Sequence, residues 1–132
     1  MEQELILVYN ADSGVFDIIK DAFQKTFFPS TYQCNLCALT YGTFGLKSEW
    51  KEFIDKLEIP YEFYHRDEFY KQLESHPNHL KDVKFPAIFL NRDGRINLLI
   101  DHKTINNQTT LKGLMTLISS KLNEEINRLR DK

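Results

Sequence analysis

The alternation of hydrophobic and polar positions divides the chain into short segments typical of strands and helices. Residues 5–9 form a continuous apolar run, as expected of a strand buried on both faces of a sheet. After polar residues 10–14, apolar side chains recur at helical spacing over 15–27. Asp12 or Ser13 can cap this helix by accepting backbone N–H bonds. The first part of the chain therefore predicts a strand followed by a helix.

The middle of the chain predicts a helix, a strand and a second helix after a long irregular segment. Residues 28–47 show no clear periodicity, and connections of this length are often functional. A hydrophobic stripe at helical spacing predicts a helix over 48–57, and alternation predicts a strand over 61–65. Asp67 is the expected cap of the next helix, which should break at His76-Pro77.

A β-hairpin is predicted immediately after Phe85-Pro86. Two apolar runs, 87–90 and 95–100, flank a turn that contains Asp93-Gly94. Asp-Gly between two such runs is the strongest short-range hairpin signal in a sequence.

The last predicted element is a long amphipathic helix. Thr109 or Thr110 can open it. Its apolar positions recur at helical spacing and define an inner face: Leu111, Leu114, Met115, Leu117, Ile118 and Leu122. Residues 123–132 are mostly polar, so we expect them to project from the domain or to fray.

Composition narrows the class of protein. The 132 residues fit one domain, 1–132, and carry a formal charge of −2 with 42% hydrophobic residues. This charge gives no electrostatic reason to expect nucleic acid or an anionic membrane as a partner. The sequence has no apolar run of the roughly 20 residues that a membrane helix needs, and its acidic start does not resemble a secretory signal. We therefore expect a cytoplasmic single domain.

The order of the predicted elements resembles that of the thioredoxin fold. Two passages of strand, helix and strand, followed by a hairpin and a covering helix, predict an α/β protein with a mixed four-stranded sheet. The resemblance extends over Phe85-Pro86 and the hairpin through Gly94. It implies a thioredoxin-like three-layer sandwich with helices on both faces of the sheet. It further implies a cis Phe85-Pro86 peptide bond, with Pro86 lying against redox cysteines.

Cys34 and Cys37 form a Cys-x-x-Cys pair, which is a signature of thiol–disulfide chemistry in proteins with this pattern of elements. At a helix N-terminus the first thiolate is stabilised, so Cys34 would be the nucleophile and Cys37 the resolving thiol. The expected partner is then a protein thiol or disulfide. The pair nevertheless follows the first predicted helix, whereas thioredoxins carry it directly after the first strand, where this chain has 10–14.

Two other interpretations of the cysteines stay open. Cys34 and Cys37 could hold zinc together with His76 and His79, with His65 as another third ligand. Zinc is the only cofactor that the sequence indicates. Alternatively, both cysteines could be small buried hydrophobic residues without chemistry.

A polar pocket is predicted beyond the ends of the strands expected over 5–9 and 61–65, because ligands bind beyond the carboxyl ends of parallel strands. The expected residues are Asn10, Asp12, Ser13, His65 and Arg66. His65 could act as acid or base, Arg66 as an anion clamp and Asp12 as an orienting carboxylate. The alternative is purely structural: Asp67 caps a helix and Glu68 complements its dipole.

Overall fold

The computed structural model describes residues 3–10, 35–42, 45–73, 80 and 82–130. In chain order its elements are β1 (Gln3–Val8), α2 (Asn35–Thr40), β2 (Tyr41–Gly42), β3 (Gly45–Leu46), α3 (Ser48–Lys56), β4 (Tyr61–Tyr64), α4 (Arg66–Leu73), β5 (Ala87–Arg92), β6 (Arg95–Ile100), α5 (His102–Asn106) and α6 (Leu111–Arg130). The helix expected over 15–27 lies outside the described residues.

The main sheet has four strands in the order β4-β1-β5-β6. Strand β1 is parallel to β4 and antiparallel to β5, so Val8 has Tyr64 on one side and Ala87 on the other. Strand β6 is antiparallel to β5. Consequently the carboxyl ends of β1, β4 and β6 and the start of β5 lie together along one end of the sheet, the border that runs across the strands. We call this border the Pro86 edge.

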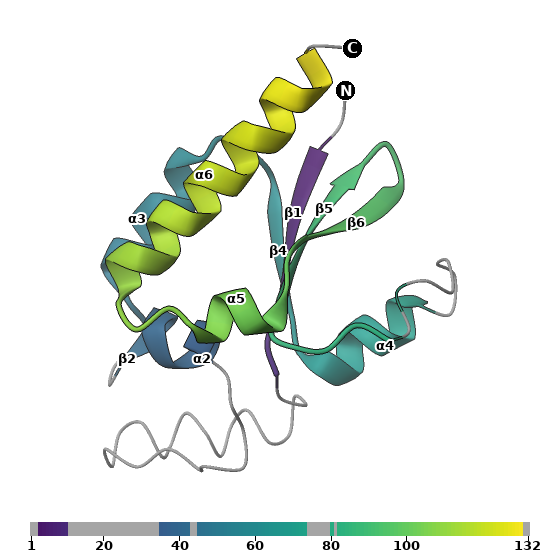
Figure 1. Cartoon of the computed structure of the whole chain (residues 1–132). Helices are drawn as coiled ribbons and strands as arrows, with labels where there is room; N and C mark the ends of the chain where they lie inside the picture. Colours follow the sequence, from purple (N-terminus) through teal and green to yellow (C-terminus); the bar gives the residue numbers. More distant parts are fainter. Residues whose placement is uncertain (1–2, 11–34, 43–44, 74–79, 81, 131–132) are drawn as a thin grey trace.

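Helices cover both faces of this sheet (Figure 1). On one face α2, α3, α5 and α6 enclose a buried cluster with side chains of β1, including Leu5 and Leu7. On the other face Phe69 of α4 stacks on Phe89, with ring centroids 4.8 Å apart, beside Ile6 and Val8. Because every other side chain of a strand faces the same way, β1 supplies both clusters. The predicted α/β class with a mixed four-stranded sheet is confirmed.

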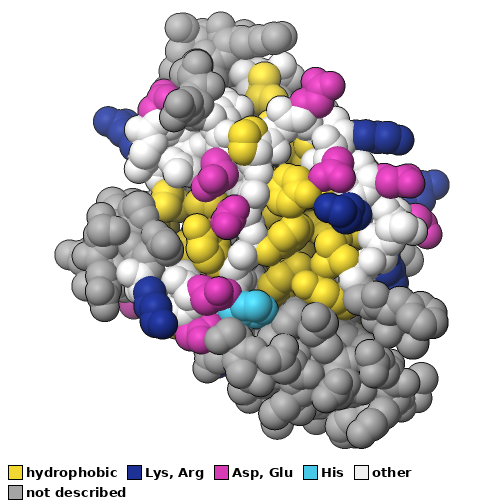
Figure 2. Space-filling view, turned by 180° about the vertical axis from the view of Figure 1, so that it is seen from behind, with side chains coloured by type: hydrophobic (Ala, Val, Ile, Leu, Met, Phe, Trp, Pro, Cys, Tyr) yellow, Lys and Arg dark blue, Asp and Glu magenta, His cyan; other side chains and the backbone are white. Residues whose placement is uncertain are grey.

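Strand β4 is an edge strand that its neighbours cover incompletely. Tyr61, Phe63 and Tyr64 are each only partly buried, although β4 pairs fully with β1. Figure 2 views the molecule from behind and shows hydrophobic side chains gathered in the middle of this face, framed by acidic and basic groups. Tyr61 also donates a hydrogen bond to Asp55 of α3 at 2.7 Å. The side chains of α3 and β4 therefore meet at the protein surface.

The hairpin of β5 and β6 turns at the predicted place. Asp93 and Gly94 both have positive φ, 52° and 88°, as a two-residue type I′ loop requires. The backbone N–H of Gly94 donates to the Asn91 side chain at 3.1 Å. The loop sets Arg92 directly opposite Arg95. The structure also confirms the cis Phe85-Pro86 peptide bond immediately before β5.

The predicted cap of α4 is wrong, and of the two outcomes expected for the C-terminal tail, fraying is not seen up to Arg130. Asp67 does not cap α4, since the helix begins at Arg66 and Asp67 lies in its first turn. The backbone N–H of His65 instead donates to the Glu68 carboxylate at 2.8 Å, which is one half of a capping box. The C-terminal tail also continues as helix to Arg130. Ion pairs one turn apart, including Glu125 with Arg128, support this polar part of α6.

Replacement of Gly94 tests the hairpin. Gly94→Ala should lower the free energy of unfolding by about 1 kcal/mol, because an L side chain is strained at positive φ. Apart from Gly94 and its two chain neighbours, no heavy atom lies within 4 Å of the added Cβ, so contact with the rest of the protein cannot cause the loss. Urea denaturation measures it. Gly94→Asn is the matched control and should lose less, since asparagine tolerates this conformation. Equal losses in the two variants would contradict the explanation.

Candidate functional site

The Pro86 edge carries a cavity of about 360 Å³. Its walls come from Asn10 after β1, from α4, from the residues that precede Pro86 and from α5, which follows β6. The polar residues that line it are Asn10, Arg66, Tyr70, Lys84, His102 and Asn106. Cationic or titratable side chains come from three separate elements, and none of the described lining residues is acidic. The cavity therefore favours an anionic or hydrogen-bond-accepting group.

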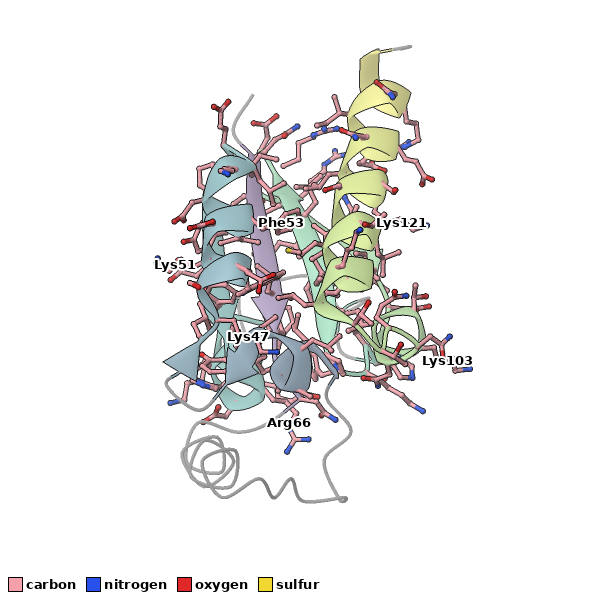
Figure 3. The ribbon with its side chains drawn as sticks, turned by 90° about the vertical axis from the view of Figure 1, so that its left-hand side faces the viewer. Lys47, Lys51, Phe53, Arg66, Lys103 and Lys121 are labelled. Carbon is pink, nitrogen blue, oxygen red and sulfur yellow. The ribbon has the colours of Figure 1, made fainter. Side chains whose placement is uncertain are left out.

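The structure brings together some of the residues predicted for the polar pocket. The Arg66 guanidinium donates from Nη1 to the Asn10 side-chain oxygen at 3.4 Å. Figure 3 shows Arg66 pointing out from the end of the sheet. His65 does not line the cavity; its Nδ1 lies 2.5 Å from a Glu68 carboxylate oxygen. Asp12 and Ser13 lie outside the described residues.

Helix α5 contributes two cavity residues that the sequence analysis missed. His102 and Asn106 are four positions apart on the same side of α5, while Ile105 is fully buried in the core. Asp101 caps this helix by accepting from the Thr104 backbone N–H at 2.9 Å and from its hydroxyl at 2.6 Å. The sequence signal for this helix cap is an Asp followed three residues later by a Thr, Asp101 and Thr104.

The hydrogen bonds from Thr104 lower the pKa of Asp101 below its usual value. A lowered pKa in the folded state means that the cap stabilises the protein above the pKa of the unfolded chain. That contribution is lost as the pH falls through the folded-state pKa. The Asp101 cap therefore stabilises α5 least at acidic pH.

Cys37 lies on α2 and is completely buried. It is disulfide-bonded, and no free cysteine occurs among the described residues. It belongs to the same buried cluster as Leu36, Ile105 of α5 and Leu114 of α6. Cys34, the only other cysteine of the chain, lies outside the described residues.

Tyr9 connects α2 to the Pro86 edge. Tyr9 directly follows β1. Because β1 and β5 are antiparallel and Val8 is opposite Ala87, continuing the register places Tyr9 opposite Pro86. The Tyr9 ring packs edge-on against Tyr41, with centroids 5.7 Å apart, immediately after the end of α2. Burial raises the pKa of Tyr9 well above its ordinary value, and the Tyr41 hydroxyl raises it further. A neutral, buried tyrosine thus lies between the helix of Cys37 and the Pro86 edge.

The sequence suggests a zinc site formed by Cys34, Cys37, His76 and His79. Cys34, His76 and His79 lie outside the described residues. Within the part of the chain that is described, no three His, Cys, Asp or Glu side chains gather as a metal site would require. Among the same residues, no helix has the length and apolar character needed to cross a membrane.

Comparison of the chain with protein-family models, with curated proteins and with solved structures gives no match. Function must therefore be argued from the residues of this site.

Removal of the Asp101 cap tests whether α5 depends on it. Asp101→Ala should reduce the free energy of unfolding by about 1 kcal/mol at pH 7, because the Thr104 backbone N–H loses its acceptor. The difference from the native protein should shrink as the pH falls through the lowered pKa of the native Asp101 carboxylate, because the native carboxylate is then protonated as well. Urea denaturation at several pH values measures both effects. Asp101→Asn keeps an acceptor and should cost less at pH 7; a loss equal to that of Asp101→Ala would contradict the capping role.

Proposed function

We propose that the chain is a thioredoxin-like domain in which Cys34 and Cys37 form a reversible thiol–disulfide pair, acting as an oxidoreductase or a thiol sensor. The observation that carries this proposal is the state of Cys37. It is disulfide-bonded and fully buried on a helix that packs, through Tyr9, beside the Pro86 edge.

Two features of the fold support the proposal. The strand order β4-β1-β5-β6, with a parallel first pair and an antiparallel hairpin, is the order that the resemblance to thioredoxins implies. The cis Phe85-Pro86 bond precedes the hairpin, again as the resemblance implies. The displaced position of the cysteines in the sequence is the departure from that pattern, and Tyr9 packs against Tyr41, which directly follows the helix of Cys37, beside the Pro86 edge.

The proposed reaction is disulfide exchange. The Cys34 thiolate attacks one sulfur of a partner disulfide and forms a mixed disulfide, while the other partner sulfur leaves as a thiolate and takes up a proton. The Cys37 thiolate then attacks the Cys34 sulfur, which releases the reduced partner and leaves the Cys34–Cys37 disulfide. Two electrons pass from the domain to the partner. The burial of Cys37 suits this second role, since an outside disulfide cannot reach its sulfur.

A second function is favoured by the surroundings of Cys37. Cys37 belongs to a buried cluster in which Leu36, Ile105 and Leu114 are likewise fully buried hydrophobic residues. A sulfur in such surroundings suits a permanent structural role, and the domain would then bind a partner without catalysis. A zinc-holding pair is the other form of this alternative.

The redox potential of the pair distinguishes these functions. The native protein, equilibrated with glutathione buffers and trapped with a thiol-alkylating reagent, should show a two-electron transition between about −270 and −120 mV, the range of known oxidoreductases. Cys34→Ser and Cys37→Ser are the matched controls, and each should abolish the transition. Only Cys37→Ser should retain a thiol that reacts rapidly with an added disulfide.

Two results would contradict an oxidoreductase. A potential below about −300 mV would identify a structural disulfide instead. Stoichiometric zinc in the protein purified under reducing conditions, lost in both serine variants, would select the metal-holding alternative.

A further inference from the structure

A second cavity, of about 260 Å³, lies at the opposite end of the sheet from the Pro86 edge. Arg92 lines this cavity and pairs with Gln3 at the start of β1, which locates the cavity at this end of the sheet. Its other charged residues are Arg95 of β6 and Glu125 and Arg128 of α6. Figure 1 shows the last turns of α6 and the β5–β6 hairpin at this same end of the molecule. We call it the arginine cavity.

Arg92 and Arg95 form an unfavourable pair. They are directly opposite across the antiparallel ladder, so both side chains leave the same face of the sheet. Like charges in this position destabilise a sheet. Leu90, two residues before Arg92, belongs to the buried cluster that includes α6, so this is the face turned toward α6. The hairpin therefore presents two guanidinium groups to the cavity.

The described residues do not neutralise these two arginines. Glu125 is engaged by Arg128 of its own helix through both carboxylate oxygens, with the Arg128 Nε 3.3 Å from Oε2. The Arg92 Nε is buried and has no hydrogen-bond acceptor in the part of the chain that is described. Among the described lining residues, three arginines against one glutamate leave a formal excess of two positive charges. A buried donor without an acceptor is costly unless a ligand supplies one.

The rest of the cavity wall is apolar. Leu90, Leu98 and Leu99 line it beside the arginines. Leu99 packs against the buried cluster that contains Leu90, so these two leucines lie on the same face as the arginines, whereas Leu98 is opposite Phe89 of the other face. An anion with an attached hydrophobic group would cover this surface and satisfy the guanidinium groups together.

We propose that the arginine cavity binds a small phosphate monoester that carries an apolar organic group. A phosphate monoester has a charge of about −1.5 to −2 at neutral pH, which matches the excess positive charge. Its oxygens accept hydrogen bonds from the paired N–H groups of a guanidinium. A carboxylate, with a single negative charge, would neutralise the excess positive charge only in part. The organic group packs against Leu90 and Leu99. The site is independent of the proposed redox function, because it lies at the other end of the sheet and none of its described lining residues is a cysteine.

The test is calorimetric titration of the full chain with phenyl phosphate, which has both a phosphate and an apolar ring. Binding should be tighter than that of inorganic phosphate and of benzoate, which each lack one of the two features. The double variant Arg92→Gln, Arg95→Gln should bind phenyl phosphate at least about tenfold more weakly. Lys103→Gln removes a positive charge on α5, far from this cavity (Figure 3), and should change the affinity less than about twofold.

A second variant guards against a folding defect. Arg92→Lys, Arg95→Lys keeps both charges but loses the paired N–H donors, so its affinity should lie between those of the native protein and the glutamine variant. Amide chemical shifts should move on titration at residues 90–99 and 125–128. Failure of phenyl phosphate to bind, equal losses in Lys103→Gln and the double glutamine variant, or shifts confined to the Pro86 edge would each overturn the proposal.

Discussion

The pairing of β1 with β4 on one side and β5 on the other is the constraint on which the rest of the structure depends. One parallel and one antiparallel neighbour fix a register in which Val8 lies between Tyr64 and Ala87. That register gathers the ends of three strands and the start of a fourth at the Pro86 edge. It also places the β5–β6 turn beside the start of β1. The positions of both cavities therefore follow from the ladder of a single buried strand.

The two ends of the sheet differ in how their polar groups are supported. At the Pro86 edge, Asp101 fixes α5 so that Ile105 enters the core while His102 and Asn106 line the cavity. Tyr9 packs the end of α2 onto the same edge. At the other end the ladder sets Arg92 against Arg95, and no described acidic group separates them. One end is preorganised by caps and packing, whereas the other retains an electrostatic cost that a bound anion would remove.

Much of the fold was predictable because its signals are local. The apolar run before Tyr9, the Asp93-Gly94 turn and the stripe of α6 each record the periodicity of one element. The expectations that differ from the structure concern the ends of helices. At the start of α4, the His65 backbone N–H bonds to Glu68, where Asp67 was the expected cap, and ion pairs support the extension of α6 through the polar tail. Helix α5 was missed because five residues show too little periodicity to be recognised.

The sequence by itself determined the class of fold, the hairpin, the cis proline expectation and the identity of the two cysteines, since each follows from neighbours in the chain. It also supplied Asn10 and Arg66, because the carboxyl ends of parallel strands meet at one edge. Only the tertiary structure decided that Cys37 is buried, that α5 completes the cavity at the Pro86 edge and that α6 closes a cavity over Arg92 and Arg95. These arrangements join residues far apart in the chain, and packing between elements, not local periodicity, sets them.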